Sequence, residues 1–443
     1  MHYIIIGGDA AGMSAAMQLV RFGDNPDITV LEETDQYSYA QCGLPYFLGG
    51  IVNSTESLVA RSREEFRDRY GINALAYHQA TNVDPKRKTV SGRKLNKDEP
   101  FSFTYDRLLV ATGASPIIPG LPGIDLPGVH VLKTIAHAEQ IKDELQHAQH
   151  AAVIGGGYIG LEVAENLAHL GKQVSIFERQ PYLARNFDPE MSNRLLQEAE
   201  RHGITVHLNA EVCELRGGES VTEVVTEDGS FPADIVIVAV GITPNSGFLG
   251  TEFTKHPSTA VKINKYLETS VTDVFAAGDC AVHYHRIKQT DDYVPLGTTA
   301  NKQGQLAALN MLGTKTPFGG VVGTAIFRFF ELTAARTGLS KLEAEAIHRP
   351  AAVVDHETGA HAGYMPEAGQ LAVRLVYDPV TRLLLGAQAI GSGADKRIDV
   401  LSTALYSGLT IEQLLELDLA YAPPYNGVWD PIQQTARKAP SDR

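Results

Sequence analysis

The stretch from Tyr39 to Gly50, YAQCGLPYFLGG, holds one cysteine able to do redox chemistry, Cys42. Many redox enzymes place two cysteines five positions apart at the start of a helix, but the fifth position after Cys42 is Phe47. Disulfide exchange proceeds through attack of a thiolate on a disulfide sulfur, so the sulfur partner of Cys42 must be exogenous. We expect Cys42 to lie where a helix begins. The N–H groups and the helix dipole at such a position favour the thiolate, which is the reactive form.

The two other cysteines are interpreted as structural. Cys213, in NAEVCEL, lies in a predicted strand and is expected to pack, and Cys280 is expected to be buried. Three cysteines in 443 residues make no disulfide framework and fit a reducing, cytoplasmic setting. The histidines, including His356 and His361 in HETGAHAGY, show no metal-ligand spacing, so we predict no metal site.

Two strand–turn–helix units are predicted to position the redox chemistry. In the first, an apolar strand and a glycine turn precede a helix at about 13–22, and a second strand, 28–31, ends at Glu32. The pattern recurs with a strand at 151–154, the turn GGGYIG, a helix to about 170 and a strand ending at Glu178. Two such units far apart predict two dinucleotide-binding domains.

The second unit carries the fuller dinucleotide fingerprint, Gly155-x-Gly157-x-x-Gly160. Its glycines allow a tight turn and close approach of the backbone to a pyrophosphate, which then lies at the helix N-terminus. Glu178, 18 residues past Gly160, is placed to accept hydrogen bonds from ribose hydroxyls and to repel a 2′-phosphate. This favours NADH over NADPH, although Arg179 can pair with a 2′-phosphate and weakens the preference.

The first unit is irregular, with Gly7, Gly8 and Gly12, and with Asp9 where the middle glycine of the fingerprint would fall. Two distant segments strengthen the interpretation. In the segment TDVFAAGDCA, an apolar strand ends at Asp279, whose carboxylate can hold the hydroxyls of a ribityl chain. In the segment YDRLLVATGASP, another strand ends in a turn of small residues, 111–113. Together these segments predict two nucleotide cofactors on one chain.

From Met1 to about Pro431 the chain resembles the flavin-dependent pyridine nucleotide–disulfide oxidoreductases. The resemblance implies an α/β fold of two Rossmann-like domains and a C-terminal α+β dimerisation domain. The expected boundaries are 1–116 with 245–322 for the FAD domain, 117–244 for the NAD(P)H domain and 323–443 for the dimerisation domain. Proline- and glycine-rich segments, 115–128 and 241–247, fit the two crossings between the nucleotide domains. A hairpin at 371–377 and 383–387 and helices at 394–407 and 410–416 fit the last domain.

The resemblance also assigns site residues. Glu162, in GYIGLE, matches a family glutamate near the flavin and the nicotinamide. The residues implied to hold FAD are Gly7, Gly12, Glu32, Ala111, Thr112, Gly113 and Asp279. Those implied to hold NADH or NADPH are Gly155, Gly157, Gly160 and Glu178.

Within the family, YAQCGLPY and PLGTTANKQGQ resemble the coenzyme A disulfide reductases of the single-cysteine branch. Peroxidases and oxidases of this branch typically carry a histidine where this chain has Ala10. Tyr364 and Tyr421, preferred over Tyr425, match two tyrosines that the partner subunit brings to the cysteine, which implies a homodimer with the active site completed in trans. The implied reaction is reduction of coenzyme A disulfide, or a related small disulfide, through a Cys42–S–S–CoA mixed disulfide. Reduction of persulfides or polysulfides and water-forming oxidation of NADH remain alternatives.

Charge and composition limit the partners. A net charge of −14 argues against nucleic-acid binding, and neither a signal peptide nor an apolar run of about 18 residues is recognised. The phosphates of coenzyme A require a locally basic entry, for which the candidates are Arg21, Arg61, Arg63, Arg67, Arg69 and, more weakly, Lys302. RSREEFRDR also fits a solvated helix face with alternating charge. A redox-responsive binding protein is the remaining class, and turnover would distinguish it from an enzyme.

Overall fold

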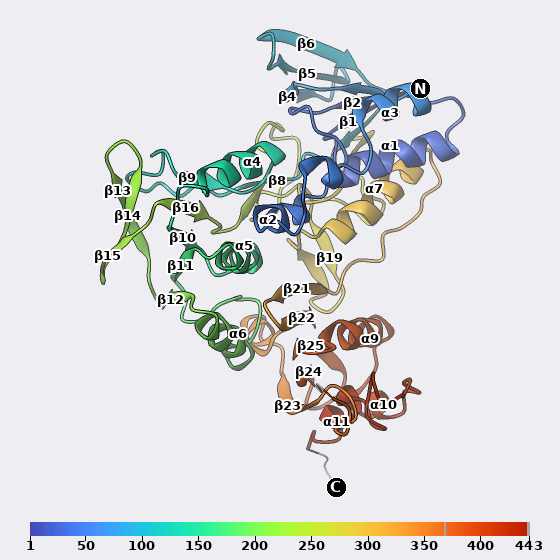
Figure 1. Cartoon of the computed structure of the whole chain (residues 1–443). Coiled ribbons are helices and arrows are strands. Elements are labelled where there is room, and N and C mark those ends of the chain that lie inside the picture. The colour runs from blue at the N-terminus through green and yellow to red at the C-terminus, as the bar shows by residue number, and fades with distance from the viewer. Residues whose placement is uncertain (367–368, 441–443) are drawn as a thin grey trace.

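The computed structural model describes residues 1–366 and 369–440 and places the cysteine segment between two duplicated nucleotide domains (Figure 1). The first domain contains a parallel sheet in the order β18-β7-β1-β2-β3. Its strands are β1 (His2–Ile6), β2 (Asp27–Leu31), β3 (Asn73–Leu75), β7 (Arg107–Val110) and β18 (Val274–Ala276). The isoleucine run of β1 is buried on both sides, as expected of a central parallel strand.

The two faces of this sheet are covered differently. Ile5 packs with residues of α1 (Ala10–Phe22) and α7 (Gly297–Met311), which lie side by side in Figure 1. Ile4 and Ile6 face an antiparallel sheet of β4 (His78–Asp84), β5 (Thr89–Lys94) and β6 (Glu99–Thr104). The smaller elements of this domain are α3 (Arg63–Tyr70), the 3₁₀ turn η2 (Thr55–Leu58), β19 (His283–His285) and β20 (Thr290–Asp292).

The second domain repeats this plan with a parallel sheet in the order β12-β11-β10-β16-β9. These strands are β9 (Val129–Val131), β10 (His150–Ile154), β11 (Gln173–Glu178), β12 (Thr205–Leu208) and β16 (Ile235–Val238). One face packs on helices α4 (Ile135–Glu144), α5 (Tyr158–His169) and α6 (Pro189–Arg201). The other packs on a sheet of β13 (Val212–Gly217), β14 (Val221–Thr226) and β15 (Gly229–Pro232).

The chain crosses between the domains through β8 (Ala114–Pro116) and β17 (Ile242–Pro244), which pair antiparallel with each other. The helix that follows Cys42, α2 (Leu44–Leu48), comes from the first domain in sequence. Its side chains Leu44, Phe47 and Leu48 nevertheless pack in the core formed by α4 and α5. The cysteine segment therefore spans the joint between the two nucleotide domains.

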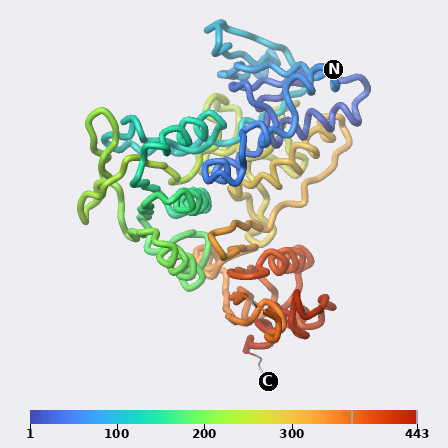
Figure 2. The backbone as a smooth tube through the Cα atoms, in the orientation of Figure 1, coloured from blue at the N-terminus to red at the C-terminus, as the bar shows by residue number. Residues whose placement is uncertain are grey.

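The C-terminal domain is built on an antiparallel sheet in the order β21-β22-β25-β24-β23. Its elements are β21 (Ala325–Phe329), β22 (Leu332–Gly338), α8 (Lys341–Ala346), β23 (Ala352–Gly359), β24 (Gln370–Tyr377), β25 (Leu384–Gly391), α9 (Ala394–Ser407), α10 (Ile411–Leu415) and α11 (Pro431–Ala436). One face packs on α9, α10 and α11, and the other joins the core of the second domain. Figure 2 shows this domain at the end of the molecule that holds the C-terminus.

The predicted fold class is confirmed: two Rossmann-like domains with parallel sheets precede an antiparallel α+β domain. The predicted hairpin is present as β24 and β25, and the predicted helices are present as α9 and α10. The domain boundaries at 116/117, 244/245 and 322/323 stay predictions. Within the described ranges, no helix combines the length and the apolar character needed to cross a membrane.

Candidate active site

Cys42 lies in a 3₁₀ turn, η1 (Gln41–Gly43), directly before α2, and is exposed. Pro45 stands in the first turn of α2, where its fixed φ suits a helix start. Phe47, at the position where a second cysteine would fall, is only 6% exposed and packs in the core. The short helix thus presents one thiol and uses the other position for packing.

The expectation that its surroundings favour the Cys42 thiolate is wrong. Desolvation, followed by the carboxylates of Glu162 and Asp279, raises the pKa of the thiol above its ordinary value, while Lys133 opposes the shift. The helix dipole does not compensate, because α2 has only five residues and begins with a 3₁₀ turn. In the protein alone, the surroundings of Cys42 therefore favour the protonated thiol.

Glu162 is the second titratable group of the site, and it lies on α5 opposite α2. Burial raises the pKa of Glu162 to about 7, a hydrogen bond from Tyr46 opposes that shift, and Glu165 adds to it. The Tyr46 hydroxyl donates to Glu162 Oε1 over 3.2 Å. Arg328 of β21 lies beside this pair, with Nε 3.4 Å from Glu165 Oε1. Glu162 can therefore hold or release a proton near neutral pH.

Sequence reasoning missed three of these neighbours. Tyr46 stands four residues after Cys42 within the quoted stretch, and this closeness in sequence was a usable signal. Lys133 and Arg328 lie far along the chain from Cys42 and carried no local signal. Only the packing of α4, α5 and β21 around α2 brings them to the site.

The first glycine turn leaves no room for side chains where the helix meets the sheet. Gly7 has φ +115°, and a Cβ on it would lie 2.1 Å from the carbonyl oxygen of Ala111. A Cβ on Gly12 would lie 1.9 Å from the carbonyl oxygen of Gly7. The Glu32 carboxylate closes the turn by accepting the N–H groups of Gly8 (2.8 Å) and Thr34 (3.0 Å).

The surroundings of this turn fit FAD. Asp279 Oδ1 is buried and has no hydrogen-bond partner within the described chain, as expected of an acceptor for a ribityl hydroxyl. Gly113, with φ +65°, has open space beside its Cα, so the backbone of the 111–113 turn can be approached closely. Asp9, at the place of the middle glycine, accepts a hydrogen bond from Gln41 Nε2 (2.8 Å), and burial raises its pKa to about 6.

The second glycine turn repeats this geometry. A Cβ on Gly155 (φ +109°) would lie 2.4 Å from the carbonyl oxygen of Ala239, and one on Gly160 would lie 2.0 Å from that of Gly155. Gly157, by contrast, faces open space, which suits a bound pyrophosphate. The Glu178 carboxylate accepts the N–H groups of Gly156 (2.7 Å) and Gln180 (2.8 Å).

Tyr364 and Tyr421 do not meet Cys42 within one chain. They are 73% and 47% exposed and belong to loops of the C-terminal domain, whereas α2 lies among the nucleotide domains (Figures 1 and 2). A hydrogen bond to Tyr421, in which the protonated Tyr364 hydroxyl is the donor, raises the pKa of Tyr364, so the two side chains are neighbours. Tyr425, Val428 and Trp429 of the same region are also exposed.

Three of the basic candidates for a coenzyme A entry are already paired with acidic side chains. On and beside α3, Arg61, Arg63 and Arg67 pair with Glu65 (3.8 Å), Glu64 (3.4 Å) and Asp68 (2.7 Å). These local pairs match the solvated, alternating helix face. Arg21, in the last turn of α1, and Lys302, on α7, are exposed, and their role stays a prediction.

The packing expected for Cys213 is wrong, whereas Cys280 is buried as expected. Cys213 follows the buried Val212 on β13, and successive residues of a strand point to opposite faces. Its thiol therefore lies on the outer face of the three-stranded sheet. The Cys280 thiol contacts the carbonyl oxygens of Val110 and Ala277, each at 3.4 Å.

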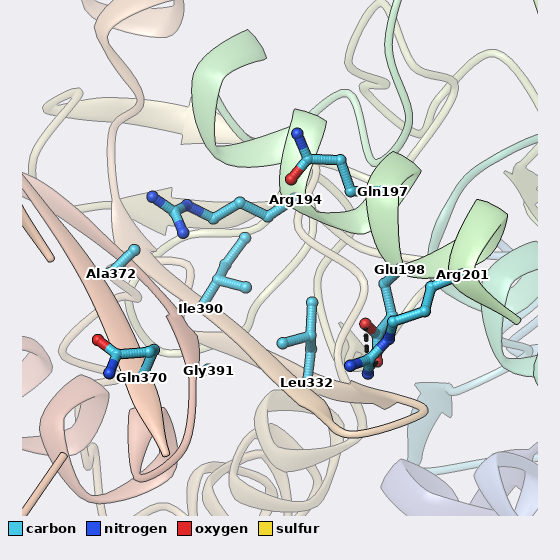
Figure 3. A pocket seen from close by; sticks show the side chains of 9 residues that line it. All are labelled: Arg194, Gln197, Glu198, Arg201, Leu332, Gln370, Ala372, Ile390 and Gly391. Atoms are coloured by element: carbon cyan, nitrogen blue, oxygen red, sulfur yellow. Dashed lines mark hydrogen bonds and ion pairs between the residues drawn. The ribbon is translucent and has the colours of Figure 1, made fainter. Parts of the chain in front are cut away.

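A cavity of about 240 Å³ lies away from Cys42, between α6 and the C-terminal sheet (Figure 3). Its arginines are occupied: Arg194 pairs with Glu357 (2.7 Å) and Arg201 pairs with Glu198 (2.8 Å). The lining residues are Arg194, Gln197, Glu198, Arg201, Leu332, Gln370, Ala372, Ile390 and Gly391. We interpret this cavity as part of the contact between the second nucleotide domain and the C-terminal domain.

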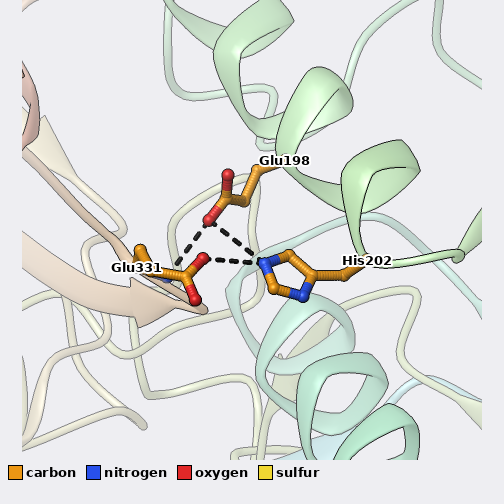
Figure 4. Close-up of side chains that lie close together, drawn as sticks. All are labelled: Glu198, His202 and Glu331. Carbon is orange, nitrogen blue, oxygen red and sulfur yellow. Dashed lines mark hydrogen bonds and ion pairs between the residues drawn. The ribbon is translucent and has the colours of Figure 1, made fainter.

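Three possible metal ligands meet at the edge of this contact between domains: Glu198 of α6, His202 directly after α6, and Glu331 of the β21–β22 turn (Figure 4). The Arg201 guanidinium contacts both carboxylates, and the N–H of Glu331 donates to Glu198 Oε1 (3.1 Å). A cation already occupies the position between the acids. We therefore interpret the cluster as an ion-paired contact between α6 and the C-terminal sheet.

Comparisons with known proteins agree with this architecture. The family model described as "Pyridine nucleotide-disulphide oxidoreductase" matches residues 1–304, and that of the family's dimerisation domain matches residues 324–431. An NAD(P)H sulfur oxidoreductase (CoA-dependent) of Pyrococcus abyssi is 36% identical over 98% of this chain and 97% of its own length. A coenzyme A disulfide reductase of Staphylococcus haemolyticus is 33% identical over 98% of each chain.

Among solved structures, an NAD-dependent persulfide reductase from A. fulgidus matches with a TM-score of 0.95 and 35% identity, covering 99% of this chain and 82% of that one. The chain belongs to the pyridine nucleotide-disulphide oxidoreductase family, as an FAD-dependent NAD(P)H oxidoreductase in the group of disulfide reductases, persulfide reductases and NADH oxidases.

Proposed function

We propose that the chain reduces coenzyme A disulfide, or a related small disulfide, with electrons from NAD(P)H through a Cys42–S–S–CoA mixed disulfide. The observation that carries the proposal is the isolation of the Cys42 thiol. Cys42 is exposed, Phe47 replaces a second thiol beside it, Cys280 is buried, and Cys213 is on a strand of the other nucleotide domain. With no internal thiol available, the second sulfur comes from a substrate.

The proposed cycle is balanced for two electrons. The Cys42 thiolate attacks one sulfur of the disulfide and releases the first thiolate, which takes up a proton. Two electrons from NAD(P)H then cleave the mixed disulfide, which restores the Cys42 thiolate and releases the second thiol. When bound, FAD would accept a hydride from NAD(P)H and deliver the electrons to sulfur. The net reaction consumes one NAD(P)H, one proton and one disulfide and yields NAD(P)⁺ and two thiols.

Named residues support each part of this proposal. Gly7, Gly12, Glu32, the 111–113 turn and Asp279 would hold FAD, and Gly155, Gly157, Gly160 and Glu178 would hold NAD(P)H. Glu162, with a pKa raised to about 7 by burial, can exchange a proton at the centre of the site. Because the surroundings raise the pKa of Cys42, a hydrogen-bond donor near its sulfur would assist thiolate formation.

Tyr364 and Tyr421 are our candidates for that donor, from a second copy of the chain. In one chain they are exposed together with Tyr425, Val428 and Trp429, an apolar surface that a partner would cover. The dimerisation domain matches a family model over 324–431. We infer a homodimer in which each Cys42 receives the tyrosine pair of the other subunit.

Two other acceptors suit the same thiol: a persulfide or polysulfide, and oxygen reduced to water. The similarity to sulfur and persulfide reductases favours the persulfide as the second candidate. All three reactions use the same cofactors and Cys42 and differ in the acceptor on which turnover depends.

The first test is intact-mass spectrometry of the protein purified without reductant, before and after addition of a thiol. We expect a coenzyme A adduct on Cys42 that reductant releases, and no adduct on a Cys42→Ser variant. Anaerobic oxidation of NADH should then depend on coenzyme A disulfide in the wild type and be lost in C42S. Cys213→Ser, which removes the other exposed thiol, serves as the matched control and should keep full activity.

A persulfide on Cys42, or faster turnover with polysulfide than with coenzyme A disulfide, would replace the proposed acceptor. NADH consumption that depends only on oxygen would identify an oxidase. Flavin that NADH reduces but that no acceptor reoxidises within seconds would indicate a redox-responsive binding protein.

A further inference from the structure

Arg397, on α9, is a buried guanidinium that the reaction proposed above does not use. It is 2% exposed, yet each of its three nitrogens donates hydrogen bonds. Nε donates to Asp430 Oδ2 (3.2 Å) and Nη1 to the carbonyl oxygen of Gly393 (3.2 Å). Nη2 reaches the carbonyl oxygens of Ala360 (3.0 Å) and Tyr425 (3.1 Å) and Asn426 Oδ1 (3.1 Å). Arg397 is therefore the centre of a polar node in which three separate loops meet.

Two of these loops carry the exposed tyrosine pair. Ala360 lies four residues before Tyr364, and Tyr425 lies four residues after Tyr421. The loops also contact each other directly, because the N–H of Ala362 donates to the carbonyl oxygen of Pro423 (3.2 Å). Nη2 of Arg397 binds the backbone carbonyls of Ala360 and Tyr425, so it constrains the main chain that presents the tyrosines.

The node is complete in charge and in hydrogen bonds. Asp430 and Asn426, 2% and 1% exposed, hydrogen-bond to each other over 2.7 Å. Asp430 Oδ1 also caps α11 by accepting the N–H of Ile432 (2.9 Å), and Asn426 Nδ2 donates to the carbonyl oxygen of Ala420 (3.3 Å), directly before Tyr421. Only the planar fork of an arginine serves partners in so many directions, and a lysine would keep the charge without that geometry.

We propose that Arg397 is a positioning residue for the disulfide-reducing site, because it holds the loops of Tyr364 and Tyr421 in the arrangement in which the pair enters the Cys42 site of a second copy of the chain. The inference rests on the proposed function and adds to it: a residue remote from Cys42 in its own chain acts on the Cys42 of its partner. Arg397 touches neither substrate nor cofactor in this scheme.

A crosslink between Cys42 and position 421 tests the placement of the loop without any assumption about the substrate. We would introduce Tyr421→Cys into FAD-loaded protein carrying Cys213→Ser, so that no other exposed thiol competes. Mild oxidation should join two chains covalently through Cys42 and the new thiol, and Cys42→Ser should abolish the product. Adding Arg397→Lys should slow crosslinking roughly tenfold, whereas Lys396→Met, a neighbouring cation 3.9 Å from Asp430, should change it less than about twofold.

Kinetics of the native site then separate positioning from general damage. In R397K without the introduced thiol, reduction of the flavin by NADH should stay within about twofold of the wild type. Turnover with the disulfide should fall roughly 10- to 100-fold, as expected when a group near the reacting atoms is misplaced by about an ångström. A merely structural role for Arg397 would slow both steps together.

Mixed dimers give the decisive test of action in trans. R397K subunits, which are slowed, and C42S subunits, which are inactive, should give more activity when mixed than either gives alone, because one site of the mixed dimer has an intact Cys42 and an intact tyrosine pair. Glu162→Gln mixed with C42S is the matched control and should not recover, since Glu162 and Cys42 belong to one chain.

The failures are distinguishable. Crosslinking that R397K leaves unchanged, or mixed dimers that do not recover, would overturn the role of Arg397 alone. Absence of any crosslink between chains would overturn both this role and the shared active site. Normal crosslinking in a protein that does not reduce coenzyme A disulfide would overturn only the proposed substrate.

Discussion

The hydroxyl of Tyr46 donates a hydrogen bond to Glu162 Oε1 across 3.2 Å and so joins the helix after Cys42 to the helix of the second glycine turn. The two residues are 116 positions apart in the chain. Burial, with a smaller contribution from Glu165, raises the pKa of Glu162, and the hydrogen bond from Tyr46 opposes this shift.

The first prediction concerns stability and pH. Folding raises the pKa of Glu162 from its ordinary value of 4.5 to about 7. Ionised Glu162 therefore destabilises the fold, and the free energy of unfolding falls as the pH rises from about 4.5 to about 7. Glu162→Gln should therefore raise the free energy of unfolding at pH 8 by up to about 3 kcal/mol and change it little at pH 4.5. Urea unfolding of the FAD-loaded protein at both values measures the difference. A stabilisation that is equal at the two pH values would contradict the assignment.

The second prediction compares two glycines of the second turn. A Cβ on Gly157 meets nothing within 4 Å, whereas a Cβ on Gly160 would lie 2.0 Å from the carbonyl oxygen of Gly155. Gly157→Ala should leave Tm nearly unchanged but raise KM for NADH roughly tenfold, because the methyl group enters the space expected for the pyrophosphate. Gly160→Ala should lower Tm and the yield of folded protein. Thermal unfolding and steady-state kinetics on both variants check this, and a normal KM in G157A would argue against the pyrophosphate site.

The third prediction concerns the choice of nicotinamide cofactor. Glu178 closes the second turn through the N–H groups of Gly156 and Gln180 and is expected to bind ribose hydroxyls. Glu178→Ala should lower kcat/KM for NADH roughly tenfold, since hydrogen bonds to a charged group contribute about 1.5–3 kcal/mol. The value for NADPH should fall less, because the repulsion of its 2′-phosphate is also removed.

Arg179→Ala is the matched control for that change. It should lower kcat/KM for NADPH more than kcat/KM for NADH, because Arg179 directly follows Glu178 and its guanidinium is the expected partner of the 2′-phosphate. If the ratio of kcat/KM for NADH to kcat/KM for NADPH is the same in E178A as in the wild type, Glu178 does not select the cofactor.

The fourth prediction tests the joint between the second and C-terminal domains. Asp188, 1% exposed, lies 3.3 Å from Arg374 Nη1, and its Oδ2 accepts Gln388 Nε2 (2.9 Å) and the N–H of Lys341 (3.2 Å). Asp188→Ala leaves these buried donors short of an acceptor and should cost about 3 kcal/mol of stability. Glu190→Ala removes an exposed partner of the same arginine and should cost under about 1 kcal/mol. Denaturant midpoints of the two variants should differ clearly, and equal midpoints would mean that the joint contributes little.

The sequence by itself determined the parts of this protein whose cause is local. Gly7 and Gly155 adopt a positive φ in their turns, and Gly12 and Gly160 are required by contacts with those same two glycines. Glu32 and Glu178 bind N–H groups of the two turns. The absence of a second thiol at Phe47 is read directly from the sequence. The β24–β25 hairpin and helix α9 follow from the pattern of neighbouring residues. Such features could be predicted because turn geometry and side-chain periodicity act over a few residues.

The tertiary structure decided what depends on distance between remote residues. Cys42 was expected to favour the thiolate from its place at a helix start, but Glu162 and Asp279, each more than 100 positions away, help to raise its pKa. Likewise, Arg397 meets the loops of Tyr364 and Tyr421 only after the C-terminal sheet and α9 have packed. Desolvation and Coulomb interactions depend on where the folded chain places each group, and no local pattern records that placement.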